Sequence, residues 1–548
     1  MKQKPIGRVI ATERTPTTID KFQFWMNDDE KLRAFDVVKV KHIDDSYSYG
    51  VIENISHITD AQSFLTNFIS SDFGDAELEP PTLRFGMNFA EASVSFNSKH
   101  LDTPVRNNAA VFRAEPNEIL FALGLDKIQN PLACGMLRMY EGTDAELNLP
   151  VNFNSKFLLG PEGAHLNISG ISGLAAKTSY AMFLIKSIQD HYICNRSDET
   201  VAFVLFNVKG RDLMAVHREN DDVEAVREQY LNMGLTPKPF ERVRYFIPFE
   251  QSTYLSRDDV ENYISARLLK KFKYTYEDDR ESIEMLFADI DDPNQTMESI
   301  ISKIIDDSDP EFGSISSWDG FLGKLGEMSQ KSSGKGGNEI SVLSWRKFKR
   351  IINKTIKNDS MFANRCDGNS ECRLASELKS IAPNDVFVID IAKLSSDKQA
   401  FVFGDAVKTI YNLKLGEYDD EGVEPPSKIV IFIDELNKYA SKDTPRSSPI
   451  LQVILDVTER GRSMGVILFG AEQFRSNIHA RVTGNCATHA YGRTNSIETA
   501  AADYRNLPQT YKNMLTRLEQ GEYLIQNPIF RSLLKIRFPK PIYKQFND

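Results

Sequence analysis

The sequence predicts an α/β protein with a small β-barrel at its amino terminus and an inserted, mostly helical subdomain. Three observations lead to this prediction. The first 150 residues hold short β-rich segments, apolar strands alternate with helical stretches from His165 onward, and helical periodicity dominates between about Ser252 and Ala382. The chain has 548 residues, whereas one domain usually has ~100–200. We therefore expect several domains.

The amino-terminal region consists of short segments rich in β-branched and aromatic residues, separated by turns. Such segments favour strands, and several in close succession favour a small barrel or a sandwich. One short helix is expected near the end of the region, at Asn117–Leu125. The predicted strands are Gly7–Glu13, Lys21–Trp25, Asp36–His42 and Tyr47–Ile55.

The region from His165 onward has the pattern of a parallel sheet. Continuous apolar runs such as Ile429–Ile433 suit strands that are buried on both faces by helices. The predicted strands are Leu166–Ser169, Val201–Val208, Val243–Pro248, Asp385–Ile391, Lys428–Ile433 and Met464–Gly470. We expect a barrel over residues 1–155, a core in two parts over 156–250 and 383–548, and a helical insertion over 251–382. The second part of the core would end in C-terminal strands and a tail.

Composition excludes several classes of protein. Hydrophobic residues make up 41% and charged residues 26%, as in ordinary folded proteins. No apolar run approaches the ~18 residues of a membrane helix, and the amino terminus lacks the apolar core of a signal peptide. We therefore expect a cytoplasmic protein with no membrane association. The net charge of −11 argues against a protein that coats nucleic acid, although it leaves room for a basic channel.

The strongest local signal lies in His165–Ile185, where an apolar strand, a small-residue loop, a Lys-Thr pair and an amphipathic helix follow one another. Triphosphate binding needs this order, because backbone N–H groups of the loop and helix surround the β-phosphate. Lys177 would reach the β- and γ-oxygens of ATP, and the Thr178 hydroxyl would ligate Mg²⁺. The predicted nucleotide-binding residues are Gly170, Ser172, Gly173, Ala176, Lys177, Thr178 and Ser179.

This loop departs from the usual phosphate-binding pattern at two positions. Ala176 replaces the glycine before the lysine, and Gly170 lies one residue farther upstream than the pattern places it. Either the backbone differs, or one residue of the longer loop bulges outward. The alternative interpretation is a Gly/Ser turn followed by a helix with a solvated lysine.

A second signal is the apolar strand that ends in two adjacent acids within Lys428–Ala440. In a Walker B arrangement, Asp434 would hold the water shell of Mg²⁺ and Glu435 would polarise the attacking water. The alternative is an acidic helix N-terminus after a strand, which the helix dipole favours.

A third signal is the segment Thr458–Gln473, which combines an arginine-bearing helix end with another buried strand. Arg460 or Arg462 would stabilise charge on the transferring phosphoryl group, in the site of a neighbouring subunit, and Gln473 would sense the γ-phosphate. The alternative is a pair of solvated arginines in a loop.

The order of these segments resembles the HerA-type ATPases, which belong with the FtsK-like hexameric DNA pumps. The resemblance covers nearly the whole chain. The segments that carry it are GRVIATERTPTTIDKFQFW at the start, Pro104–Asp126, Leu149–Gly170, Phe206–Leu213, Asp385–Leu394 and Leu518–Phe530. Besides the altered loop, Ala164 stands where some members have an arginine that acts on nucleotide, and Asn207 stands where an aspartate is common.

The resemblance implies a RecA-like P-loop ATPase core and an N-terminal barrel of the HAS-barrel type. It further implies a homohexameric ring with ATP and Mg²⁺ at each subunit interface, which moves duplex DNA through a central pore. A separate effector, a nuclease or a sirtuin-like NAD-consuming enzyme, would dock on the barrel face, and the divergent loop favours a member that acts in antiphage defence. The alternative is a nucleotide-binding ring scaffold that activates a partner enzyme with little hydrolysis. A secretion or conjugation ATPase of related fold would need a membrane-docking segment.

DNA contacts have two candidate segments. Trp345–Lys357 is a basic helical stretch with interleaved aromatic residues, and the Lys331–Gly337 loop offers Lys331 and Lys335 beside glycines. Either would line a pore. A solvated helix face that balances acidic stretches such as Glu277–Glu284 explains the same residues.

Overall fold

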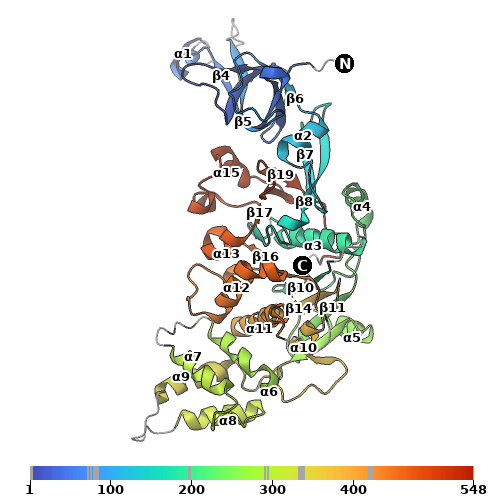
Figure 1. Ribbon diagram of the computed structural model, residues 1–548, viewed down its shortest axis with the longest axis vertical. Helices are drawn as coiled ribbons and strands as arrows, with labels where there is room; N and C mark the ends of the chain where they lie inside the picture. The colour runs from blue at the N-terminus through green and yellow to red at the C-terminus, as the bar shows by residue number, and fades with distance from the viewer. Residues whose placement is uncertain are drawn as a thin grey trace.

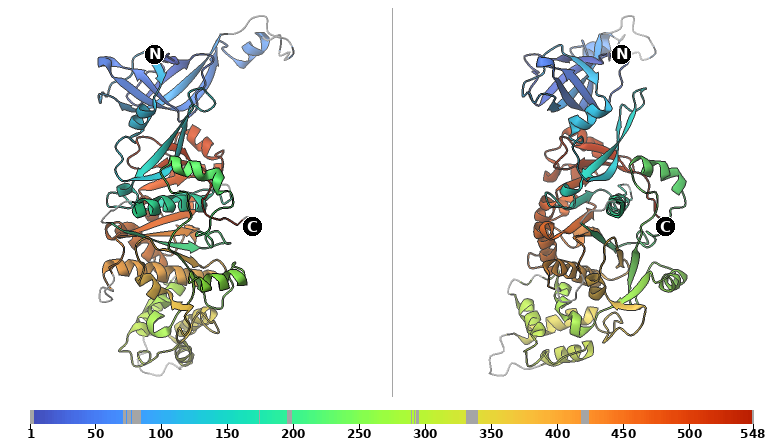
Figure 2. Two further views of the ribbon diagram at one scale, coloured as in Figure 1. Left: turned by 90° about the vertical axis from the view of Figure 1, so that its right-hand side faces the viewer. Right: turned by 45° about the vertical axis from the view of Figure 1, so that its right-hand side comes forward.

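The computed structural model describes residues 4–70, 73, 77, 85–173, 175–194, 199–288, 290, 292, 295–330, 340–417 and 424–546. The molecule is elongated, with a barrel at one end, a large sheet in the middle and a group of helices at the other end (Figure 1). The C-terminus returns to the middle of the molecule, beside the large sheet. Figure 2 shows that α1 (Phe64–Ser70) projects sideways from the barrel.

Six antiparallel strands close the amino-terminal barrel in the order β1-β2-β5-β4-β3-β6. Alternate side chains fill its interior, and Phe22, Phe24 and Val38 are fully buried there, as expected for a small barrel. The predicted barrel is thus confirmed. The strands are β1 (Gly7–Ile10), β2 (Lys21–Met26), β3 (Val37–Lys41), β4 (Tyr47–Thr59), β5 (Gly86–Asn97) and β6 (Ala110–Arg113), and α2 (Pro116–Leu123) follows them.

The second sheet of the described residues has 13 strands in the order β13-β12-β11-β14-β10-β15-β16-β9-β17-β18-β19-β7-β8. From β13 to β17 the neighbours run parallel, and from β17 to β8 they run antiparallel. The parallel strands are β9 (Leu166–Ser169), β10 (Val201–Asn207), β11 (Val243–Pro248), β12 (Leu269–Lys273), β13 (Glu371–Arg373), β14 (Val386–Asp390), β15 (Lys428–Asp434), β16 (Val466–Glu472) and β17 (Thr488–Tyr491). The others are β7 (Pro131–Met139), β8 (Leu147–Asn154), β18 (Glu522–Gln526) and β19 (Leu534–Arg537).

Helices cover both faces of this sheet, which explains why its central strands are apolar throughout. Along β10, Phe203 and Leu205 pack into one hydrophobic cluster with α3, whereas Val204 and Phe206 pack into a second cluster with α11 and α12. The predicted α/β core is therefore confirmed. The covering helices are α3 (Lys177–Cys194), α4 (Val223–Asn232) and α5 (Arg257–Ser265) in the first cluster, and α11 (Ser396–Leu415) and α12 (Pro449–Met464) in the second.

The predicted helical insertion folds mainly into helices at the far end of the molecule (Figure 1). It also supplies β12 and β13, which extend the parallel edge of the sheet. Periodicity did not indicate these strands, because they are short and β12 reads LKKFK. Besides α5, the helices of this segment are α6 (Tyr276–Asp279), α7 (Thr296–Ile305), α8 (Trp318–Met328), α9 (Val342–Thr355) and α10 (Leu374–Lys379). Near the C-terminus lie α13 (Ala480–Asn485), α14 (Ser496–Thr499) and α15 (Gln509–Leu515).

The barrel strands end at Arg113, and the β7–β8 hairpin already belongs to the large sheet. Phe35 of the barrel stacks on Tyr511 of α15 at a ring distance of 4.3 Å, so the two parts are in contact. The domain boundaries at residues 155, 250 and 382 stay predictions. Within the described ranges, no helix has the length and apolar character needed to span a bilayer.

Candidate nucleotide-binding site

Three neighbouring parallel strands bring the candidate residues to one edge of the sheet. β16 lies between β9, which leads into the small-residue loop, and β15, which ends at Asp434. In the register, Asp434 faces Ala471 and Glu472 faces Ser169. Since parallel strands lie ~4.8 Å apart, the loop and the acids are about 10 Å apart at the level of the backbone, and side chains can bridge that gap.

The side chains close this gap directly. The Thr178 hydroxyl donates to Oδ2 of Asp434 at 3.2 Å, although the two residues are 256 positions apart. Beside them, Lys177 Nζ donates to the Gly170 carbonyl at 2.9 Å and to Oγ of Ser172 at 3.1 Å. Burial lowers the pKa of Lys177, and the Asp434 carboxylate opposes that shift. The two oxygens that accept from Lys177 are both uncharged, so this buried cation can receive an anion.

Ala176 and Gly170, the two residues at which the loop departs from the usual pattern, both have positive φ. Ala176 has φ +50°, so this alanine adopts the left-handed conformation that a glycine would adopt there. Gly170 has φ +154°, and a Cβ at this position would lie 2.5 Å from Cβ of Ala175. Only glycine fits at residue 170, whereas residue 176 tolerates alanine at the cost of local strain.

The strain at Ala176 leads to a prediction. Ala176→Gly should raise the free energy of unfolding by about 0.5–1 kcal/mol and keep nucleotide binding, because glycine adopts positive φ without a steric penalty. Ala176→Val should lower both the free energy of unfolding and the nucleotide affinity, because a β-branched side chain fits that backbone worse. Chemical denaturation together with a nucleotide titration would measure the effects. A glycine variant less stable than the valine variant would contradict the prediction.

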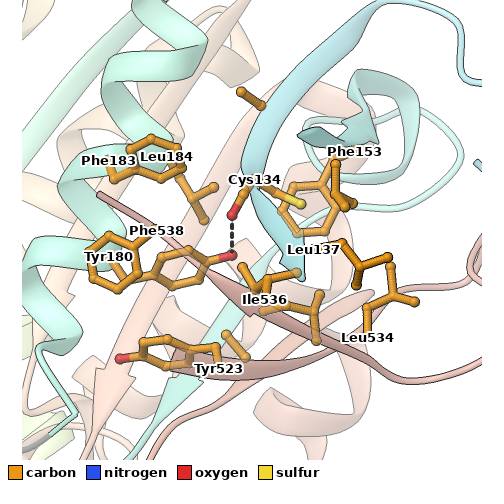
Figure 3. Close-up of a cluster of buried hydrophobic side chains, with 14 of the residues drawn as sticks. Cys134, Leu137, Phe153, Tyr180, Phe183, Leu184, Tyr523, Leu534, Ile536 and Phe538 are labelled. Atoms are coloured by element: carbon orange, nitrogen blue, oxygen red, sulfur yellow. Dashed lines mark hydrogen bonds between the residues drawn. The ribbon is translucent and has the colours of Figure 1, made fainter. Parts of the chain in front are cut away.

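Aromatic side chains support the loop and α3 from one face of the sheet. The Tyr523 hydroxyl donates to the Ala175 carbonyl at 2.5 Å, and its ring stacks on Tyr180 at 4.6 Å. The Tyr180 hydroxyl in turn donates to the Cys134 carbonyl at 3.2 Å (Figure 3). Strands β7 and β18 thus fix the position of the loop, because buried polar groups of tyrosine are held by hydrogen bonds.

The acidic pair lies at the end of β15. Asp434 is almost fully buried, and its Oδ1 accepts from the backbone N–H of Glu435 at 2.8 Å. Glu435 has φ +58° and precedes the 3-10 turn η6 (Leu436–Lys438). Its carboxylate pairs with Lys438 Nζ at 2.6 Å. Only a three-residue turn follows the pair, so a helix dipole does not account for these acids.

The residues around Oδ2 of Asp434 fit a divalent cation. A hydroxyl and a carboxylate oxygen converge there, and hard oxygen ligands are those that Mg²⁺ prefers. A positive group already stands at this place, since Lys209 Nζ lies 2.8 Å from Oδ2 of Asp434. The field at this point therefore attracts a cation.

Sequence reasoning missed Glu472, the last residue of β16. Its side chain is fully buried, and neither carboxylate oxygen has a hydrogen-bond partner among the described residues. Burial raises its pKa to about 8, against the opposing effects of Asn167, Arg475 and Lys177. The signal in the sequence that could have identified Glu472 is its place at the end of a buried strand, directly before Gln473. Glu472 lies inside the site, whereas Gln473 is exposed.

The raised pKa of Glu472 predicts a pH-dependent stability. The folded chain holds this proton up to about pH 8, whereas an unfolded glutamate releases it near 4.5. The contribution of the protonated Glu472 carboxyl to the free energy of unfolding is thus complete below pH ~4.5 and is lost as the pH rises toward 8. Glu472→Gln should therefore be more stable than wild type by a few kcal/mol at about pH 8–9 and similar at pH ~5.

Thermal unfolding of both proteins across this pH range would measure the difference. Glu519→Gln, at an exposed carboxylate, is a matched control that should follow the wild type at every pH. Parallel pH profiles for Glu472→Gln and the wild type would show that the prediction is wrong.

The predicted arginines lie at the amino-terminal ends of the parallel strands, whereas the candidate site lies at their carboxyl ends. Arg460 and Arg462 are exposed near the end of α12, just before β16 begins. Seven residues of β16 separate the arginines from the candidate site, which is roughly 20 Å along the strand. Arg462 instead donates to the Glu162 carbonyl at 3.4 Å. These arginines do not reach the site of their own chain, so a role in catalysis requires a second copy.

Comparison with known proteins gives a structural likeness alone. No family model and no curated protein sequence matches the chain. VirB4 of Thermoanaerobacter pseudethanolicus is similar with a TM-score of 0.42 at 9% identity, over 75% of this chain and 97% of that chain. The bacterial conjugative coupling protein TrwBdeltaN70 has a TM-score of 0.42 at 11% identity, over 70% and 87%. The genome packaging NTPase B204 from Sulfolobus turreted icosahedral virus 2 has a TM-score of 0.22 at 15% identity, over 30% of this chain and 71% of that chain. Likenesses at these TM-scores and identities assign no activity to this chain.

The basic candidate for a DNA contact is α9. Its aromatic residues are not available to bases, because Trp345 and Phe348 are buried and stack on Phe312 and Phe287 at 5.7 and 4.7 Å. Cations such as Lys347 and Arg350 are exposed on the outer side. This arrangement fits contacts with phosphates better than stacking on bases. The other candidate, Lys331–Gly337, lies outside the described residues.

Proposed function

We propose that this protein is a Mg²⁺-dependent ATPase that binds ATP between the small-residue loop and the acidic pair. The contact of Thr178 with Asp434, beside the buried Lys177, is the observation that carries the proposal. In this function Lys177 binds the β- and γ-phosphates, and Thr178 and Asp434 hold the metal. Gly170, Ser172, Gly173, Ala176 and Ser179 surround the phosphates. The bound metal neutralises phosphate charge, and Glu435 orients the attacking water.

The proposed assembly is a homohexameric ring in which each site is completed by the next chain. The exposed position of Arg460 and Arg462 supports this, since both lie far from their own phosphate loop. In a ring, one of them stabilises charge on the phosphoryl group of the neighbouring site. Gln473, exposed directly after β16, would sense the γ-phosphate from within the same chain.

The proposed work of the ring is translocation of duplex DNA in the cytoplasm, coupled to a separate effector. Exposed cations on α9 support a contact with phosphates. The resemblance to HerA-type ATPases supports the translocation and the effector. The effector, a nuclease or a sirtuin-like NAD-consuming enzyme, docks on the barrel face, and antiphage defence is the proposed setting.

The experiment that tests this function combines ATP turnover with the mass in solution. Purified protein with Mg²⁺ should hydrolyse ATP faster when linear duplex DNA is added. Its mass should be about six times the 62.1 kDa of one chain. A monomer that binds no ATP would contradict the proposal.

A second candidate function is a ring scaffold that binds nucleotide and activates a partner enzyme with little hydrolysis. The observation that favours it is Ala164, a buried residue where some HerA-type ATPases have an arginine. In the same assay, a large species that binds ATP without DNA-stimulated turnover supports the scaffold.

A further inference from the structure

The metal-binding carboxylate of the site already carries a positive partner. Oδ2 of Asp434 contacts Lys209 Nζ at 2.8 Å and the Thr178 hydroxyl at 3.2 Å, while Oδ1 accepts from the Glu435 backbone N–H. These three contacts exist in the free chain, before any nucleotide arrives. A metal ion that binds at Oδ2 needs the place that the ammonium holds.

The topology brings Lys209 to this place from outside the phosphate loop. Lys209 follows β10, which pairs with β15 on the side away from β16. The Lys209 side chain is 39% exposed, whereas that of Asp434 is only 4% exposed. Because a lysine side chain has four flexible carbons and one end in solvent, the ammonium can move while the carboxylate stays fixed.

The surrounding charges leave the ammonium a second position. Burial acts to lower the pKa of Lys209, but the Asp434, Glu435 and Asp212 carboxylates outweigh it and keep the lysine charged. When Lys209 leaves Asp434, it stays in the field of Glu435 and Asp212. The displaced ammonium therefore does not enter an apolar environment, and its displacement from Asp434 carries only a small desolvation penalty.

We infer that Lys209 controls the loading of the metal site: its ammonium is the counter-ion of Asp434 in the free chain and is displaced when Mg²⁺ binds with the nucleotide. The inference rests on the proposed function and names a residue that the phosphate-binding motif does not include. The Lys209 ammonium occupies the position at Oδ2 of Asp434 that Mg²⁺ or a water molecule of its shell would take. The lysine therefore sets the Mg²⁺ concentration at which the site loads.

The test is a Mg²⁺ titration of ADP binding, followed by calorimetry, for the wild type, Lys209→Met and Lys438→Met. Lys209→Met should lower the apparent Kd for Mg²⁺ about two- to fivefold, because an ion pair of this exposure opposes binding by up to ~1 kcal/mol. Lys438→Met is the matched control. It removes the same charge beside Glu435 without freeing Oδ2 of Asp434, so its effect should be smaller.

A second measurement separates displacement from a general loss of charge. Without Mg²⁺ and nucleotide, Lys209→Met should unfold at a lower temperature than wild type, since buried Asp434 then lacks its counter-ion. Mg²⁺ and ADP should raise that temperature more in the variant than in the wild type. Unchanged or weaker Mg²⁺ binding by Lys209→Met would overturn the inference. A wild-type protein that binds no ADP with Mg²⁺ would instead contradict the proposed function.

Discussion

Replacing Lys177 by alanine should abolish nucleotide binding and leave the folded chain as stable as the wild type, or more stable. Burial lowers the pKa of Lys177, which means that the free protein holds this charge in an unfavourable place. Alanine removes the unfavourable charge together with the contact to phosphate. The loss of affinity should be at least about 100-fold, since a buried charge-assisted contact is worth ~3 kcal/mol or more.

Thermal unfolding with and without Mg²⁺ and ADP would measure both parts of this prediction. At a ligand concentration about 100 times the wild-type Kd, the wild type should gain ~2.7 kcal/mol from binding, and Lys177→Ala should gain at most ~0.4 kcal/mol. Lys324→Ala is a suitable control, because Lys324 pairs with Glu327 on the surface of α8, far from the site. If Lys177→Ala kept the ligand-induced gain, the phosphate-binding role of this lysine would be wrong.

The parallel core could be predicted because its strands are apolar on both faces. The bounds predicted for Leu166–Ser169 and Val243–Pro248 agree with β9 and β11, since turn residues flank each run. The strands that were missed lack this signal. β13 has three residues, and the β7–β8 hairpin joins the sheet through pairing with β19, a contact between distant parts of the chain. Pairing partners far apart in sequence leave no local pattern.

The candidate site was predictable where a motif places chemistry at a strand end, as for Lys177, Thr178 and Asp434. Lys209 and Glu472 were not predicted, because their importance comes from side chains that other strands bring near them. The conformation of Ala176 could not be predicted either. Two backbones were compatible with the sequence, and a positive φ at an alanine leaves no local pattern in the sequence. The roles of Arg460, Arg462 and Gln473 stay predictions, because the arginines would act on the site of a neighbouring chain and Gln473 on a bound nucleotide.

Replacing Glu435 by glutamine should stop hydrolysis while nucleotide binding continues. A carboxylate that polarises water contributes about 10²–10⁴-fold to the rate, and the amide keeps its size without its basicity. Asp434 is untouched, so metal and nucleotide affinity should change less than about threefold. In the free chain Oε2 of Glu435 pairs with Lys438 Nζ at 2.6 Å.

Single-turnover hydrolysis and equilibrium binding of ATP, measured on the same preparation, would separate the two effects. Glu53→Gln serves as the control, because Glu53 lies in the barrel and pairs there with Lys21; it should hydrolyse ATP at the wild-type rate. Hydrolysis by Glu435→Gln at that rate would remove Glu435 from its proposed role. Another group at this end of the strands would then have to orient the water. Fully buried Glu472 is poorly suited as a base, because burial raises its pKa to about 8 and favours the protonated form.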